Sequence, residues 1–157
     1  MKGTETTRQY NVDLESLNDK TLPTQTQINI YTDGSRTYNH VGAGYVIYDQ
    51  STEIAAKSIR LSENTTVFQA ELLAIREAAT HFIRTKTLQQ QYIKIMTDSQ
   101  AALQALDATE YTSRIVKTTM DELNALGRNF PFQNKACSSK TNSITRSGTL
   151  LRTPIHV

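Results

Sequence analysis

Hydrophobic and polar residues alternate in two short stretches of the chain whose sequences are nearly identical. Residues 28–33 read Ile-Asn-Ile-Tyr-Thr-Asp, and residues 93–98 read Ile-Lys-Ile-Met-Thr-Asp. A period of two predicts a strand with its isoleucines on one buried face. Two such strands side by side would bring Asp33 and Asp98 together where the apolar runs end. Two carboxylates at such a short distance repel each other unless a proton or a divalent cation lies between them. The repetition therefore predicts a metal site.

A third carboxylate lies on a predicted amphipathic helix over residues 67–83. Its Glu71 borders the apolar stripe, and the residues one turn away are Val67, Phe68, Ala74 and Ile75. None of these neighbours can pair with a charge. Because an unpaired buried carboxylate is costly, Glu71 is a candidate ligand or acid rather than a structural choice.

The remaining pattern completes an α/β arrangement. Strands are predicted over residues 28–32, 43–48, 54–60 and 92–97. Further helices are predicted over residues 99–108 and from Thr112 to a stop at Gly127. The order predicts a mixed sheet of three antiparallel strands and one parallel strand, with helices packed on it. We expect a polar lead-in over residues 1–26, a folded domain over 27–127 and an irregular basic tail over 128–157.

Composition adds bounds on the class of protein. A chain of 157 residues suits one domain with a real core. The single Cys137 excludes an internal disulfide, and the three histidines have no zinc spacing, so we expect an intracellular protein of the cytoplasm or nucleus. The polar start and the lack of a long apolar run predict that it is neither secreted nor bound to a membrane.

Charge is unevenly placed along the chain. Residues 1–133 hold 13 bases and 15 acids, so that 13 − 15 = −2, whereas the rest of the chain carries +4. The basic residues of that tail could hold phosphate by simple charge, or they could serve solubility alone: Lys135, Lys140, Arg146 and Arg152.

Three short motifs, in order, carry a resemblance to a known family. They are YTDGS at residues 31–35, FQAEL at 68–72 and MTDSQ at 96–100. Together they resemble the type 1 ribonuclease H domain, and their wording is closest to the version in reverse transcriptases of non-LTR retrotransposons. The resemblance covers about residues 28 to 127. An unrelated α/β domain with coincidental acids is the alternative.

The resemblance implies a ribonuclease H-like fold and hydrolysis of the RNA strand of an RNA/DNA hybrid with two Mg²⁺ ions, for which Mn²⁺ is a possible substitute. It implies that Asp33 bridges both ions and that Glu71 and Asp98 hold the ion on the leaving-group side. It also implies a hybrid as partner, together with a reverse transcriptase region of the same element.

Strand choice in this family rests on the 2′-hydroxyl of RNA, which small polar groups near the ions can read. The candidates for this contact are Gly34, Ser35, Ser99 and Gln100. Three of them have a structural alternative, because Gly34 and Ser35 suit a turn and Ser99 suits a helix cap.

The chain also departs from the family pattern. Val67 and Phe68 stand where cellular members place asparagines, which weakens the expected contact with the hybrid. No fifth strand, histidine loop or final helix with a fourth carboxylate is recognisable, and residues 133–157 contain no Asp or Glu. We therefore expect impaired activity, since one metal site is complete and the other half complete. A shifted reading frame, a truncation and a genuine basic tail are all compatible with this end.

The sequence is also compatible with two other functions. One is a catalytically inactive nucleic-acid-binding remnant of a retroelement polyprotein. The other is a transposase core, which also sets acids on the first and fourth strands of the same superfold. The helix with Glu71 directly after the third strand favours ribonuclease H over a transposase.

Overall fold

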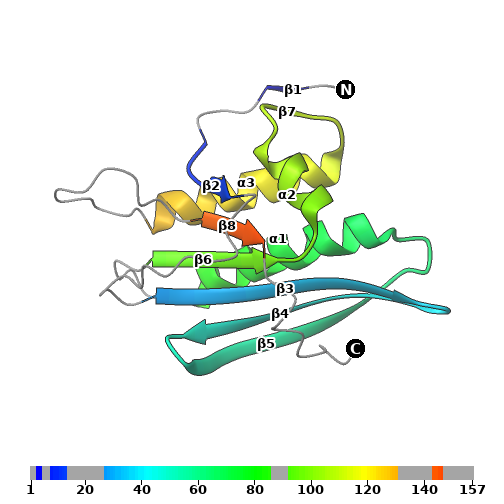
Figure 1. The fold of residues 1–157 in the computed structure, drawn as a ribbon, viewed down its shortest axis with the longest axis horizontal. Helices are drawn as coiled ribbons and strands as arrows, with labels where there is room; N and C mark the ends of the chain where they lie inside the picture. The colour runs from blue at the N-terminus through cyan, green and yellow to red at the C-terminus, as the bar shows by residue number, and fades with distance from the viewer. Residues whose placement is uncertain (1–2, 5–7, 14–26, 86–91, 131–142, 147–157) are drawn as a thin grey trace.

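The computed structural model describes residues 3–4, 8–13, 27–85, 92–130 and 143–146 of the 157. In chain order the elements are β1 (Gly3–Thr4), β2 (Asn11–Asp13), β3 (Gln27–Thr37), β4 (His40–Asp49), β5 (Thr52–Leu61), α1 (Val67–Thr85), β6 (Tyr92–Thr97), α2 (Gln100–Asp107), β7 (Glu110–Tyr111), α3 (Arg114–Asn129) and β8 (Ser143–Arg146) (Figure 1). Of the helices in these ranges, none has both the length and the apolar composition needed to traverse a bilayer.

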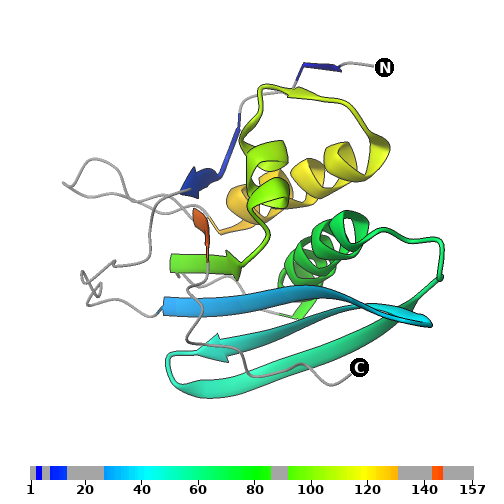
Figure 2. The ribbon, with the colours of Figure 1, turned by 45° about the vertical axis from the view of Figure 1, so that its right-hand side comes forward.

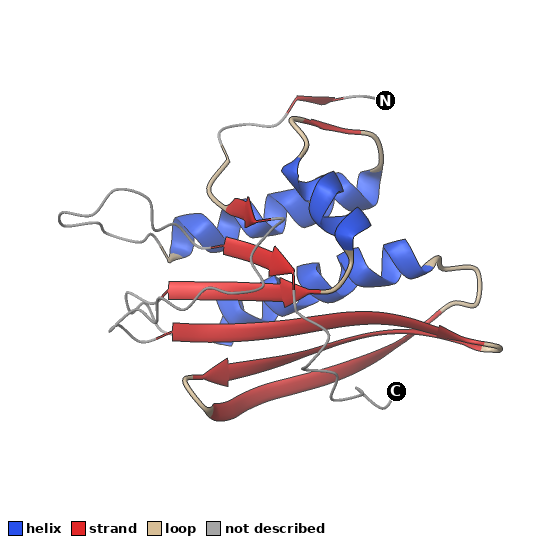
Figure 3. Ribbon diagram, viewed as in Figure 1, coloured by secondary structure: helices blue, strands red, loops and turns tan. Residues whose placement is uncertain are grey.

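The main sheet has the strand order β2-β8-β6-β3-β4-β5 (Figure 3). Strands β3, β4 and β5 are antiparallel neighbours, and β6 runs parallel to β3. The predicted mixed sheet is thus confirmed. A helical crossover from β5 through α1 to β6 is what allows β6 to lie parallel to β3.

The helices pack on one face of this sheet, as the turned view shows (Figure 2). The isoleucines of both repeated stretches are at most 2% exposed and form the sheet side of the core. The helix side comes from the apolar stripes that the sequence pattern predicts, chiefly Leu72, Ile75, Phe82, Leu103, Met120 and Leu123. This core fixes how the ends of β3 and β6 meet α1.

The expectation that the last strand is missing is wrong. Strand β8 pairs in parallel with β6 and, on its other side, with β2, so it is an inner strand of the sheet. A four-residue strand is too short for its period to appear in the sequence, which is why this segment reads as irregular. Residues 131–142 and 147–157 lie outside the described residues, and in the described part no helix follows α3.

The polar lead-in also contributes to the fold. Tyr10 is buried and donates a hydrogen bond from its hydroxyl to the Leu106 carbonyl oxygen at 2.9 Å. The Gln9 N–H donates to the Asn124 side-chain oxygen at 2.9 Å. Gly127, predicted as a helix stop, lies inside α3, where a Cβ atom would collide with the Gln9 backbone. A segment anchored by one aromatic residue has no periodic signal, so its packing could not be read from the sequence.

Candidate metal centre and active site

The two copies of the repeated sequence pair with each other in register, as the neighbouring strands β3 and β6. Strands β3 and β6 pair Ile28 with Ile93 and continue to Tyr31 with Met96, the last matched pair. Asp33 and Asp98 each lie two residues beyond that pair. The two aspartates therefore arrive at the same level of the sheet, where the strands have stopped pairing.

Gly34 lets α1 come close to this point. It lies within β3 rather than in a turn, and a Cβ atom there would be 2.5 Å from the Glu71 backbone nitrogen and 2.8 Å from the Ala70 carbonyl carbon. Real side chains do not tolerate such contacts, so only glycine allows β3 to cross the first turns of α1. This close approach places Glu71 beside the strand that carries Asp33.

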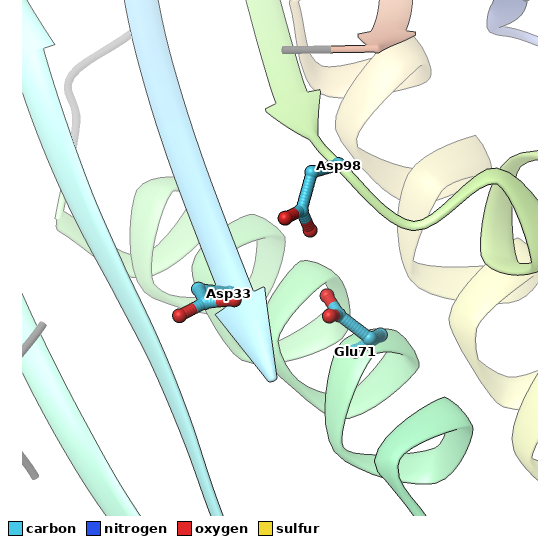
Figure 4. A group of neighbouring side chains, drawn as sticks. All are labelled: Asp33, Glu71 and Asp98. Atoms are coloured by element: carbon cyan, nitrogen blue, oxygen red, sulfur yellow. The ribbon is translucent and has the colours of Figure 1, made fainter. Parts of the chain in front are cut away.

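The three carboxylates converge from three elements (Figure 4). One oxygen from each of Asp33, Glu71 and Asp98 lies within 4.8 Å of the other two. Glu71 is buried, Asp33 is half-buried and Asp98 is exposed, so the cluster opens to solvent on the Asp98 side. The predicted clustering of these acids is confirmed.

The pKa of the buried Glu71 carboxyl is strongly raised. Burial raises the pKa of Glu71 from 4.5 to about 8, and the negative charges of Asp98 and Asp33 act in the same direction. Hydrogen bonds from the Gly34 backbone and the Thr97 hydroxyl oppose this rise in pKa but do not cancel it. A cation bound at the cluster would lower the pKa of Glu71 again, because it stabilises the ionised form of all three carboxylates. Three carboxylates with no nitrogen or sulfur donor are a ligand set that suits Mg²⁺ or Mn²⁺.

Thr97 is a site residue that the sequence analysis missed. It is fully buried, and its hydroxyl lies 3.4 Å from Glu71 Oε2 as donor and 3.2 Å from the Ser99 N–H as acceptor. It thereby links the glutamate to the turn that presents Asp98. The sequence did contain a signal for it, because a threonine precedes the aspartate in both repeats. The equivalent Thr32 also has a structural role, since its hydroxyl donates a hydrogen bond to the Met96 carbonyl oxygen of the neighbouring strand at 3.2 Å.

The other predicted site residues lie near the acids in the chain and differ in burial and secondary structure. Gly34 is buried and Ser35 half-buried within β3, so the alternative of a turn at these two residues is wrong. Ser99 is the N-cap of α2, where its side chain accepts from the Ala102 N–H. Gln100 is exposed at the first position of α2.

Comparison with protein families gives one match. The family model described as RNase H matches residues 25–147. This range reaches past β8, so the similarity extends further than the 28–127 predicted from the motifs alone. Among curated proteins, none matches this sequence.

Solved structures show the same fold at low sequence identity. The RNase H1 of the halophilic archaeon Halobacterium salinarum is 16% identical, with a TM-score of 0.54 over 77% of this chain and 83% of that one. LC11-RNase H1, isolated from compost by a metagenomic approach, is 20% identical, with a TM-score of 0.57 over 78% of this chain and 84% of that one. The same compost enzyme in complex with an RNA/DNA hybrid is 18% identical, with a TM-score of 0.56 over 76% and 83% of the two chains.

Proposed function

Because the chain belongs to the ribonuclease H family, we propose that it hydrolyses the RNA strand of RNA/DNA hybrids with magnesium ions held by Asp33, Glu71 and Asp98. The observation that carries the proposal is the convergence of three carboxylate oxygens within 4.8 Å of one another in a chain of this family. Mg²⁺ is the ion we propose, since all three donors are oxygens, and Mn²⁺ is its substitute.

Each residue of the cluster has a distinct proposed role. Bound magnesium would supply Lewis-acid chemistry at the phosphate and an activated water. By its resemblance to the family, Asp33 would bridge two ions, while Glu71 and Asp98 would hold the ion on the leaving-group side. Thr97 fixes the Glu71 carboxylate through its hydroxyl. Because Glu71 is buried, its orientation is set before a ligand arrives.

Recognition of the RNA strand is proposed for the small polar residues around the acids. Ser35, Ser99 and Gln100 lie beside Asp33 and Asp98 in the chain, and Gly34 can contribute only through its backbone. A solved relative of the same fold holds an RNA/DNA hybrid, which supports a hybrid as the ligand of this site. Contacts to the 2′-hydroxyl would distinguish RNA from DNA.

Replacing Asp33 by Asn tests the proposal, because it removes the bridging charge while keeping the shape of the side chain. We expect loss of magnesium-dependent cleavage of the labelled RNA strand in a hybrid. Asp121→Asn is the matched control, since Asp121 lies exposed on α3 in a surface ion pair with Lys117 that contributes little. Equal cleavage by wild type and Asp33→Asn would contradict the proposal.

We also propose that the activity is impaired, because no Asp or Glu follows Glu122 in the sequence. In the family a fourth carboxylate holds the water-activating ion, which here keeps only Asp33. Mg²⁺ binds weakly through so few charged ligands.

Grafting a family-like final segment with a fourth aspartate after β8 tests this impairment. The native chain should cleave more slowly than the graft by about 10² to 10⁴ in rate, and Mn²⁺ should partly rescue it. A graft with asparagine at the same position is the control. Equal rates for the aspartate and asparagine grafts in Mg²⁺ would contradict the impairment.

The same missing carboxylate favours a second candidate, a catalytically inactive domain that still binds hybrids. Binding without cleavage in both Mg²⁺ and Mn²⁺ would support it over the nuclease. We further propose an origin in a non-LTR retroelement, with a reverse transcriptase region as partner in an intracellular setting. The wording of the YTDGS, FQAEL and MTDSQ motifs supports that origin.

A further inference from the structure

The sheet face that carries Asp33 continues beyond the acids to a cationic side chain. Ser35 of β3 pairs with Gly42 of β4, which pairs with Arg60 of β5. Paired residues of neighbouring strands share a face, and every second residue of a strand returns to it. Asp33, Ser35 and Arg60 therefore lie on one face, as does His40, two residues before Gly42.

Arg60 and His40 are in direct contact on this face. Arg60 Nη2 lies 3.0 Å from His40 Nδ1. A guanidinium can only donate, so Nδ1 accepts and the proton of the neutral ring is on Nε2. Both side chains are exposed, and Arg60 forms no ion pair with a carboxylate in the described part of the chain. His40 therefore orients the Arg60 guanidinium, and no carboxylate among the described residues neutralises its positive charge.

The spacing of this pair suits an extended polyanion. Residues on one face of a strand recur about every 6.8 Å, so the Arg60 row lies about 7 Å from the Asp33 row and the His40 row about 14 Å. Arg60 also lies two strands across the sheet from Asp33, about 10 Å, so the two backbones are about 12 Å apart. A strand of a duplex rises about 3.4 Å per nucleotide, which makes this distance about three to four nucleotides. The hairpin of β3 and β4, which carries Ser35, His40 and Gly42, projects past the ends of β6 and β8 (Figure 1).

We infer that Arg60, oriented by His40, binds the phosphate backbone of the nucleic acid about three to four nucleotides from the three acids. This inference rests on the proposed function and adds a contact outside the metal centre. Arginine suits the role because its planar fork binds phosphate through paired hydrogen bonds. His40 is a positioning residue, because its Nδ1 accepts a hydrogen bond from the guanidinium and so orients it.

The test is the salt dependence of hybrid binding. Affinity of the whole chain for a labelled RNA/DNA hybrid is measured by fluorescence anisotropy between 50 and 200 mM salt, with Ca²⁺ in place of Mg²⁺ and a gel to verify that the hybrid stays intact. Each phosphate contact contributes about 0.9 to the slope of log affinity against log salt. The advantage of wild type over Arg60→Gln should therefore shrink about 3.5-fold across this fourfold range.

Arg84→Gln is the matched control. Arg84 is an exposed arginine in the last turn of α1, away from Glu71 near its start, so the same loss of charge should leave the slope unchanged. An unchanged slope for Arg60→Gln, or an equal change for both variants, would overturn the inference while leaving the proposed function standing. No binding of hybrid by wild type would overturn both.

A double substitution tests the positioning by His40. His40→Ala alone should weaken hybrid binding, since Arg60 loses its orienting acceptor, but it should keep most of the salt slope because the charge remains. Added to Arg60→Gln, it should cause no further loss. Additive losses would show that His40 acts by itself and would remove the positioning role.

Discussion

At the residue scale, Glu71 shows what helical spacing can and cannot predict. Its place beside the apolar stripe of α1 predicted burial without a partner from its own helix, and the side chain is 4% exposed. Its two donors, the Thr97 hydroxyl and the Gly34 N–H, come from β6 and β3. Such partners depend on which strands lie beside the helix, so spacing within the helix could not reveal them.

The raised pKa of Glu71 predicts how stability depends on pH. Between about 4.5 and about 8, the folded protein without metal holds a proton on Glu71 that the unfolded chain releases. The free energy of unfolding should therefore fall as pH rises through this window, by an amount of order a few kcal/mol. Urea titrations in EDTA at pH 5, 7 and 9 measure it. Glu71→Gln, which cannot ionise, should flatten this dependence, and an unflattened profile would assign it to another group.

At the element scale, the sequence predicted the segments that form β3, β4, β5 and β6 but ended the first three of these strands too early. Strand β3 continues to Thr37, so Asp33, Gly34 and Ser35 lie inside it and not beyond it. Glycine and serine usually signal a turn, and here the glycine instead marks the contact between β3 and α1. Helix starts were nearly right: Ser99 caps α2, while α3 is capped by Ser113, one residue after the predicted Thr112.

Replacing Gly34 by Ala should separate β3 from α1 and displace Glu71. The added methyl meets backbone atoms of Ala70 and Glu71, which cannot rotate away, so a cost of about 1–3 kcal/mol is expected. Urea unfolding gives the stability, and Mn²⁺ titration monitored by calorimetry gives the metal affinity, which should fall as well. Ser35→Ala, one residue along the same strand, should change neither by a comparable amount. Normal metal binding by Gly34→Ala would show that the close approach is dispensable.

At the scale of the whole molecule, sequence reasoning predicted the central part of the sheet and missed its edge. Strands β8 and β2 have four and three residues, and each is held by pairing with distant parts of the chain. Short elements of this kind depend on a neighbour already in place rather than on their own periodicity. The family match over residues 25–147 includes β8, in keeping with its place beside β6.

Thr145→Pro tests whether β8 is an inner strand. Thr145 pairs with Met96 of β6 and with Asp13 of β2, so a proline removes a donor from a strand paired on both sides. We expect a loss of about 1–3 kcal/mol in the free energy of unfolding. Thr52→Pro is the control, because Thr52 is the first residue of the edge strand β5, where proline is tolerated. Equal and small effects of both substitutions would contradict the pairing of β8.

The pairing of β2 with β8 also dictates an order of events during synthesis on the ribosome. Asn11 pairs with Ser143, so a segment made early must wait for one made much later before this edge of the sheet can close. Pairing between such distant segments makes folding slow, and a waiting partner can be taken by the wrong chain. Nascent chains stalled before residue 143 should therefore depend on chaperones, and completed ones should be released from them.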